Sequence, residues 1–264
     1  MQRLFTDQLQ REVQISWPPK RIVSLVPSQT ELLCHLGLEK ELVGLTKFCI
    51  HPPEAKTYAS IIGGTKNLHL DKIAALKPDL IIGNKEENQQ EQIEALMVDF
   101  PVWMSDISNL EEALEMIHSI GQITNRETAG KALSSEIENS FAILSSNQSP
   151  IKAAYLIWRK PYMVAASGTF IDNLLTKSGF SNVFQNESRY PQKSSEELME
   201  ARPEVILLSS EPYPFQDKHI AELQKICPEA TILLVDGELF SWYGNRLLHS
   251  ASYFAKLRKE LTSS

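Results

Sequence analysis

The sequence lacks the short motifs with which many enzymes hold a nucleotide, activate a serine or bind a catalytic zinc ion. It contains no GxGxxG, GxxxxGKS or GxxxxGKT, GxSxG or HExxH segment. Its six histidines are scattered, with no second ligand at a metal-binding spacing. We therefore expect no catalytic residue, no enzymatic activity, and no metal or cofactor that belongs to the protein itself.

Cysteine is also scarce, and Cys34, Cys49 and Cys227 match neither a CxxC motif nor a zinc spacing. We expect free thiols in or near the core. No apolar run approaches the roughly 18 residues of a membrane-spanning helix. The first twenty residues also lack the apolar stretch of a secretory signal. Either the protein stays in the cytoplasm, or the sequence begins after a removed leader.

Basic residues are also fewer than acidic residues. The 264 residues include 26 lysines and arginines against 33 aspartates and glutamates, for a formal net charge of −7. Without a basic cluster, the chain has no surface suited to phosphate backbones, so we expect no nucleic-acid partner. Hydrophobic residues make up 42% of the chain. This length and composition fit one large or two medium folded domains.

The sequence does contain a near repeat of itself. The stretch LDKIAALKPDLIIGN, residues 70–84, returns as SEELMEARPEVILLS, residues 195–209. Pro78 and Pro203 are 125 positions apart (203 − 78 = 125), and Asp71 and Glu196 have the same offset. Each copy is typical of an amphipathic helix, a basic-Pro-acidic turn and a short buried strand. The repeat predicts two similar lobes, and two facing lobes form a cleft that binds ligands.

Strand and helix patterns alternate along the chain, which predicts an α/β fold of two Rossmann-like lobes with mostly parallel sheets. A small hairpin is expected around residues 5–15. The apolar stripe of Glu127–Leu144 indicates a long helix joining the lobes, so we expect a lobe at 1–124, a linker at 125–150 and a lobe at 151–264. The remaining expected strands are Arg21–Val26, Glu41–Thr46, Leu80–Ile82, Val102–Met104, Lys152–Trp158, Val205–Leu208 and Thr231–Val235. The remaining expected helices are Gln29–Gly37, Leu70–Leu76, Gln89–Phe100, Leu110–Ile123, Phe170–Ser178, Lys218–Ile226 and Arg246–Leu261.

Aromatic residues gather in the segments that follow the predicted strands. Ligands of parallel sheets bind at those strand ends, and large rings there favour a bulky, flat, partly apolar ligand. The alternative is that the rings only pack the loops. The aromatic residues of these segments are Phe48, Trp158, Tyr162, Tyr190, Tyr213, Phe215, Phe240, Trp242 and Tyr243.

The most distinctive local sequence is DGELFSWYGNR, residues 236–246. Glu238 and Arg246 are candidates to bind a polar ligand edge, and Trp242 is a candidate to stack on a ligand face. The alternative is a structured loop closed by a salt bridge. The acidic pair Asp71 and Glu196 begins the two repeated helices, where the helix dipole alone favours carboxylates. The same pair also suits a symmetric partner with two basic pockets.

Four segments together resemble the periplasmic-binding family that serves ABC importers of cobalamin, haem and iron–siderophores. They are RIVSLVPSQTELLCHLG, VGLTKFCIHPPEA, LDKIAALKPDLIIGNKEEN and YPQKSSEELMEARPEVILL, and the resemblance extends from about Phe5 to Leu261. It implies two lobes joined by one long helix, a ligand between the lobes, and a periplasmic or cell-envelope location. In that family an acidic residue on each lobe docks into arginine pockets of the permease dimer, and these match Asp71 and Glu196.

Cobalamin-binding members carry aromatics that match Phe48, Tyr162 and Tyr190, and an acidic residue that matches Glu238. They commonly have tryptophans where this chain has Thr65 and Asn84, a departure for which Trp158 and Trp242 are possible substitutes. We therefore expect a monomeric substrate-binding protein for a bulky metal chelate, with cobalamin ahead of haem or a ferric siderophore. The alternative from another class is a cytoplasmic cofactor-binding or sensing protein without a permease, and an enzyme ranks third.

Overall fold

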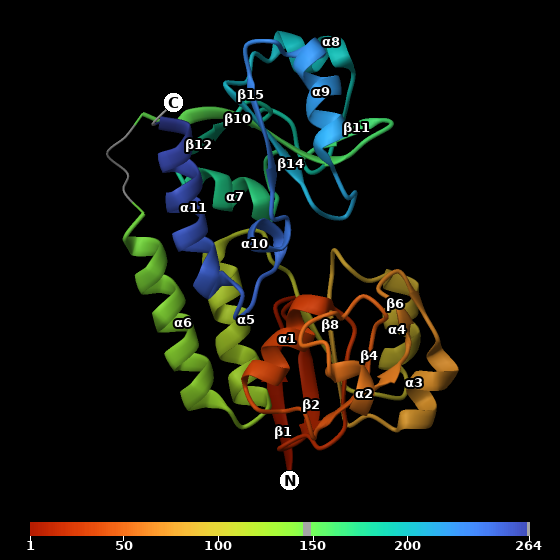
Figure 1. Cartoon of the computed structure of the whole chain (residues 1–264). Helices are drawn as coiled ribbons and strands as arrows, with labels where there is room; N and C mark the ends of the chain where they lie inside the picture. The colour runs from red at the N-terminus through yellow and green to blue at the C-terminus, as the bar shows by residue number, and fades with distance from the viewer. Residues whose placement is uncertain (145–148, 263–264) are drawn as a thin grey trace. The chain divides into compact units, whose positions relative to one another are not determined.

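The computed structural model describes residues 1–144 and 149–262, which fold into two compact units (Figure 1). Unit 1 consists of Met1–Ile107, Glu111–Glu138 and Tyr243–Asn245, and unit 2 consists of Ser108–Leu110, Asn139–Trp242 and Arg246–Ser264. Residues 145–148 of the expected linker lie outside the described residues. The expected domain boundaries stay predictions.

Unit 1 is built on a five-stranded parallel sheet in the order β5-β4-β3-β8-β9. The expected N-terminal hairpin is present as antiparallel β1 and β2, and β6 and β7 form a second small ribbon. The strands are β1 (Gln2–Thr6), β2 (Glu12–Ser16), β3 (Ile22–Ser24), β4 (Leu42–Leu45), β5 (Ser60–Ile61), β6 (Gly63–Gly64), β7 (Asn67–Leu68), β8 (Leu80–Asn84) and β9 (Val102–Ser105). The helices are α1 (Pro27–His35), α2 (Ala55–Tyr58), α3 (Leu70–Leu76), α4 (Gln90–Met97), α5 (Leu110–Ile123) and α6 (Glu127–Ala142), of which α5 begins in unit 2 and α6 ends there.

Unit 2 is built on a six-stranded mixed sheet in the order β13-β11-β10-β14-β15, with β12 beside the first residues of β10. Strands β10, β12, β14 and β15 pair in parallel, whereas β11 is antiparallel to β10 and β13. The strands are β10 (Ile151–Trp158), β11 (Tyr162–Val164), β12 (Phe180–Asn182), β13 (Gln192–Lys193), β14 (Val205–Ser209) and β15 (Thr231–Val235). The helices are α7 (Phe170–Lys177), α8 (Ser195–Glu200), α9 (Asp217–Ile226), α10 (Glu238–Ser241) and α11 (Leu247–Thr262).

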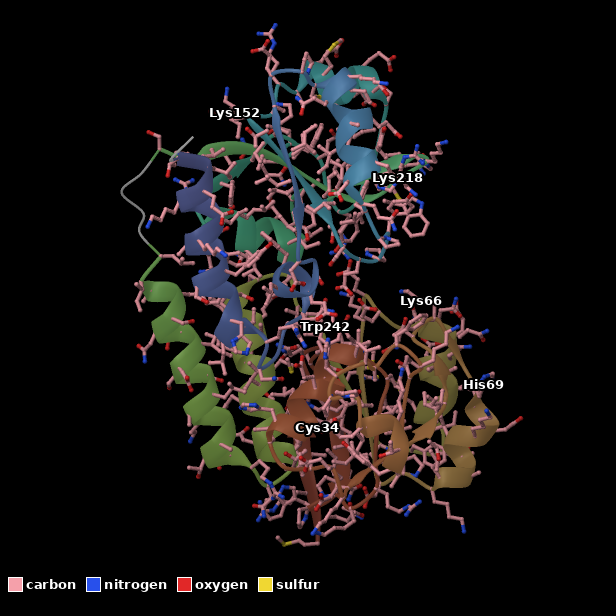
Figure 2. The ribbon with its side chains drawn as sticks, viewed as in Figure 1. Cys34, Lys66, His69, Lys152, Lys218 and Trp242 are labelled. Atoms are coloured by element: carbon pink, nitrogen blue, oxygen red, sulfur yellow. The ribbon has the colours of Figure 1, made fainter. Side chains whose placement is uncertain are left out.

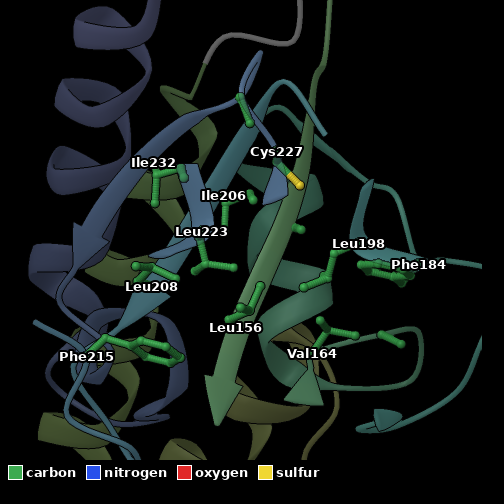
Figure 3. Close-up of a cluster of buried hydrophobic side chains, with 13 residues drawn as sticks. Leu156, Val164, Phe184, Leu198, Ile206, Leu208, Phe215, Leu223, Cys227 and Ile232 are labelled. Carbon is green, nitrogen blue, oxygen red and sulfur yellow. The ribbon is translucent and has the colours of Figure 1, made fainter. Parts of the chain in front are cut away.

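The alternating side chains of the unit 2 strands cover both faces of the sheet. On one face Leu156, Ile206 and Ile232 join a buried cluster with Leu198 of α8 and Leu223 of α9 (Figure 3). Because successive side chains of a strand point to opposite faces, the residues next to these three in each strand lie on the other face of the sheet. Strands buried on both faces explain why β14 is a continuous apolar run in the sequence.

The second face of this sheet is covered by aromatic side chains. The ring of Tyr155 in β10 lies 5.0 Å from that of Phe240 in α10, measured between centroids. Phe240 in turn lies 4.5 Å from Phe254 of α11, and Phe254 lies 6.2 Å from Phe141 of α6. These rings bury large apolar areas, so they hold α6, α10 and α11 to the sheet.

The sequence repeat extends to the backbone conformation and to hydrogen bonds. Lys77 and Arg202, at equivalent positions, both have a left-handed φ of 46° just before the repeated proline. The acidic residues after the prolines are also equivalent. Asp79 accepts hydrogen bonds at 2.8 Å from the backbone N–H groups of Lys20 and Arg21, and Glu204 accepts one at 2.8 Å from that of Lys152. The basic-Pro-acidic turn therefore ends each helix and ties the following strand to the first strand of its sheet.

Replacing Lys77 by glycine is expected to raise the free energy of unfolding by roughly 0.5–1 kcal/mol, because a side chain in the left-handed region is strained. Lys77 is the exposed C-cap of α3, with φ 46° and ψ 59°. Urea unfolding followed by circular dichroism measures the change. Lys72→Gly is the matched control, since Lys72 is exposed within the same helix and glycine there costs about 1 kcal/mol. Equal losses from both variants would contradict the argument.

The elements that sequence patterns did not predict are short. They include the three-residue strands β11 and β12, the two-residue strand β13 and the one-turn helices α2 and α10. Residues 236–246 therefore do not form a simple loop, since α10 begins at Glu238. Among the helices of the described residues, none combines the length and apolar character needed to cross a membrane.

Candidate functional site

Phe48 follows β4, at the carboxyl end of the unit 1 sheet. Its side chain is 52% exposed, although it is a large ring. The ammonium group of Lys47 lies 5.0 Å from the ring centroid. A Cβ atom at Gly64 would lie only 3.1 Å from the ring, so Gly64 leaves the space that the ring occupies. Phe48 therefore offers apolar surface to solvent from a supported position.

Asn84 and Thr65, where cobalamin-binding members commonly have tryptophan, are both buried in this chain. Oδ1 of Asn84 accepts hydrogen bonds from the backbone N–H groups of Glu86 and Glu87, at 2.9 and 3.1 Å. Its Nδ2 atom donates to the Ser105 hydroxyl at 3.0 Å. Asn84 thus closes the loop after β8, a role that an indole cannot fill.

Trp158 ends β10 at the carboxyl edge of the unit 2 sheet. It is 40% exposed, and its ring packs edge-on against Tyr213 with 5.6 Å between centroids. Tyr213 packs against Phe215 in the same way, at 4.8 Å. The rings of Trp158, Tyr213 and Phe215 thus form a continuous aromatic group, which we call the Trp158 ring group, and Trp158 is its exposed member.

Tyr162 and Arg159 converge on Glu222 of α9, a residue that the sequence patterns did not single out. The Tyr162 hydroxyl donates to Oε1 of Glu222 at 2.5 Å, and Nε of Arg159 donates to the same oxygen at 3.0 Å. The guanidinium of Arg159 lowers the pKa of Glu222 to about 2. Burial and the bond to Glu222 raise the pKa of Tyr162. Because 60 residues separate Tyr162 from Glu222, only the fold reveals this pairing.

Tyr190 lies half-buried in the segment before β13. The guanidinium of Arg189 lies 5.6 Å from its ring centroid, and Nη1 of Arg189 donates to the carbonyl of Gly168 at 2.9 Å. Arg189 has a left-handed φ of 65°, which turns the chain at this point. The turn at Arg189 and the contact of its guanidinium therefore set the position of the Tyr190 ring.

Glu238, Trp242 and Arg246 form one cluster around α10. Nη1 of Arg246 lies 2.9 Å from Oε2 of Glu238, and its guanidinium lies 5.0 Å from the Trp242 ring centroid. Trp242 (Figure 2) is only 7% exposed, and its indole N–H donates to Oε1 of Glu211 at 2.8 Å. The ion pair of Glu238 and Arg246 is the salt bridge that we expect if residues 236–246 form only a structured loop. Ligand contacts by the three residues stay predictions.

Glu211 is a second residue that the sequence patterns did not single out. Its Oε1 atom accepts hydrogen bonds from the Ser241 hydroxyl at 2.6 Å and from the Trp242 indole. Burial nevertheless raises the pKa of this carboxyl, and the carboxylates of Glu238 and Asp236 act in the same direction. Glu211 thus fixes the orientation of the Trp242 ring from below the surface.

Asp71 and Glu196 are both exposed, and each lies in the first turn of its helix, α3 or α8. Ser194 caps α8 by accepting from the backbone N–H of Glu197 at 3.2 Å. The backbone N–H at the helix start and the Ser194 side chain lower the pKa of Glu196. The repeated helices therefore present equivalent carboxylates to solvent, one on each unit.

The described residues contain no group of three or more His, Cys, Asp and Glu side chains placed to hold a metal ion. Cys34, Cys49 and Cys227 are free and buried, as expected from their spacing (Cys34 in Figure 2). Burial raises the pKa of all three thiols, so they are poor nucleophiles at neutral pH.

Comparison with known proteins adds one family and several relatives. A family model described as periplasmic binding protein matches residues 22–226. The vitamin B12-binding protein of Pectobacterium atrosepticum is 24% identical over 256 residues, which cover 92% of this chain and 90% of the relative.

Two solved structures are similar over nearly the whole chain. The periplasmic vitamin B12 binding protein of Vibrio cholerae gives a TM-score of 0.79 at 23% identity, covering 94% of this chain and 99% of that structure. The periplasmic heme-binding protein from Roseiflexus sp. RS-1 gives a TM-score of 0.79 at 21% identity, covering 92% and 98%. The predicted α/β fold class is thereby confirmed.

Proposed function

The chain belongs to the periplasmic binding protein family, and from this premise we propose that it captures a bulky metal chelate for an ABC permease. The family implies a location outside the cytoplasm, and the similar proteins carry periplasmic or vitamin-binding names. The alternative of a cytoplasmic sensor without a permease gains no support from these comparisons. The protein acts as a monomer that binds its ligand without catalysis and without a cofactor of its own.

The observation that carries this proposal is the exposure of large rings at strand ends in both units. Phe48 is 52% exposed after β4, and Trp158 is 40% exposed at the end of β10. Exposed rings on a rigid scaffold give a flat ligand much apolar contact at little cost in side-chain entropy. Haem is a flat metal macrocycle, cobalamin is built around a corrin macrocycle with axial ligands, and a ferric siderophore is a bulky chelate.

Cobalamin is the first candidate, with haem and then a ferric siderophore next. The sequence relative and one similar structure are named for vitamin B12, and another similar structure is named for heme. Phe48, Trp158 and Tyr190 contribute ring contacts in this proposal, and Tyr162 contributes a ring whose hydroxyl is held by Glu222. Glu238 and Arg246 meet the polar edge of the ligand beside Trp242.

Phe48→Ala and Trp158→Ala test the proposal, because each removes one exposed ring and leaves the sheets intact. Each variant is expected to weaken chelate binding by roughly tenfold, the size of one well-placed aromatic contact. Val98→Ala and Ile143→Ala are matched controls, since both side chains are exposed and apolar and neither lies at the end of a sheet strand. Quenching of tryptophan fluorescence by cyanocobalamin, haemin and a ferric siderophore measures affinity. Equal effects from the ring variants and the controls would overturn the assignment.

A further inference from the structure

His219 lies at the start of α9 and is 3% exposed. Its Nδ1 atom accepts a hydrogen bond from the backbone N–H of Gln216 at 2.9 Å, and its Nε2 atom lies 3.2 Å from the Tyr213 hydroxyl. His219 is the N3 residue of α9, and its own backbone N–H donates to the carbonyl of Gln216, the N-cap residue, at 2.8 Å. Glutamate or glutamine usually takes this position, so a histidine makes the cap dependent on protonation.

The hydrogen bonds fix the protonation state of the ring. Since Nδ1 accepts from a backbone N–H, it carries no proton, and the neutral ring must carry its proton on Nε2. Nε2 then donates to the oxygen of Tyr213. His219 also packs edge-on against Tyr213 and Phe215, with 5.5 Å between centroids in both pairs. The neutral histidine therefore positions two members of the Trp158 ring group.

Protonation of His219 would place an N–H opposite the N–H of Gln216 and break the cap. The positive charge would also lie at a helix N-terminus, where the helix dipole opposes it. Burial and the charges of Arg159 and Lys218 (Lys218 in Figure 2) lower the pKa of His219, whereas Glu222 on the next turn raises it. The charges that act on the ring thus come from Arg159 of the β10–β11 turn and from Lys218 and Glu222 of α9, while Tyr213 of the β14–α9 loop contacts the ring directly.

We propose that His219 is a positioning residue for the Trp158 ring group and makes ligand capture depend on pH. The inference deepens the proposed function and rests on it for the ligand. Above the ordinary histidine pKa of about 6.5, the cap is intact and Tyr213 holds Trp158 in place. Because the pKa in the folded protein is lowered, the neutral form persists somewhat below that value. As the pH falls further, protonation breaks the cap, loosens Tyr213 and releases Trp158 from its edge contact.

The ligand-free protein supplies the first test. The chain has four tryptophans, so its proton–nitrogen NMR spectrum has four indole signals, and Trp158→Phe identifies one of them. Between pH 8 and pH 5, the Trp158 signal is expected to move with a midpoint below about 6.5. The shift is expected to vanish in His219→Gln, because glutamine accepts from Gln216 without titrating. A Trp158 signal that stays fixed in the wild type, or that moves equally in His219→Gln, overturns the inference.

Ligand binding supplies the second test, with cyanocobalamin and haemin as probes at pH 7.5 and pH 5.5. Binding is expected to be roughly threefold to tenfold tighter at pH 7.5 than at pH 5.5. Each unit of difference between the His219 pKa in the free and in the bound protein gives a factor of ten in this affinity ratio. In His219→Gln the ratio is expected to approach one, whereas the exposed control His249→Gln keeps the wild-type ratio. A ratio that His219→Gln leaves unchanged overturns the inference. Absence of binding at pH 7.5 would count against the proposed function, while the NMR result still decides the role of His219.

Discussion

The double charge reversal Asp71→Lys with Glu196→Lys is expected to abolish ligand uptake through the permease while leaving ligand affinity unchanged. Both carboxylates are exposed, and both lie in the first turn of a repeated helix. Neither residue is among the side chains proposed to contact the ligand, so reversing their charges leaves the proposed ring contacts in place. Loss of uptake with intact binding would therefore assign the pair to permease docking.

The expected size of this effect follows from charge pairing at protein interfaces. Removing one partner of a desolvated charge pair costs about 2–5 kcal/mol, so each site is expected to weaken docking by roughly thirtyfold or more. Reversal adds repulsion against the arginine pockets that the family resemblance implies. Because the two residues sit at equivalent positions of the repeat, each single reversal is expected to produce a partial loss.

Uptake of radiolabelled cobalamin into vesicles that contain the partner permease measures the docking effect, and calorimetry measures ligand affinity in parallel. Glu91→Lys with Glu229→Lys is the matched control. Both residues are exposed, and Glu91 also lies in a helix first turn, so the control includes the same unfavourable helix-dipole interaction. Uptake that survives the Asp71 and Glu196 reversals, or ligand binding that falls in parallel with uptake, would show that the pair does not serve docking.

Phe254→Ala is expected to lower the free energy of unfolding of unit 2 by roughly 3–5 kcal/mol, the usual cost of truncating a buried phenylalanine. Phe254 is fully buried in α11 and contacts three rings, those of Phe141, Phe240 and Tyr253. Removing its ring leaves a cavity between α6, α10 and α11. Since α10 carries Glu238 and precedes Trp242, ligand binding is expected to weaken as well.

Chemical unfolding in urea, followed by circular dichroism, tests the Phe254 prediction. Phe254→Leu keeps most of the buried volume and is expected to cost less than about 1.5 kcal/mol. Val98→Ala, at an 81% exposed position, is expected to change stability by less than about 0.5 kcal/mol. A loss from Phe254→Ala no larger than that from Val98→Ala would mean that the contacts of the Phe254 ring do not hold α11 in place.

The long elements of this fold were predictable from the sequence because their apolar periodicity is strong. The predicted bounds of α3, α5 and β15 match those observed, and α6 is two residues shorter than predicted. Strands of two or three residues, such as β11 and β13, are too short to show a period. The one-turn helix α10 is missed for the same reason, since four residues cannot display a helical stripe.

The side-chain partners within each unit were harder to predict than the elements. Sequence reasoning placed Glu238, Trp242 and Arg246 in one segment, and they do form one cluster. It gave no sign of Glu222 or His219, because their partners Tyr162 and Tyr213 belong to other elements. Such contacts depend on how β10, β11 and α9 pack together, which no local pattern encodes.

Calorimetric titration of the purified chain at pH 7.5 shows whether the protein binds a metal chelate. The titrants are cyanocobalamin, haemin and a ferric siderophore, each added to the wild type and to Phe48→Ala. We expect saturable one-to-one binding of at least one chelate, and roughly tenfold weaker binding of that chelate by the variant. Absence of binding with all three classes of chelate would contradict the proposal that the protein captures a metal chelate.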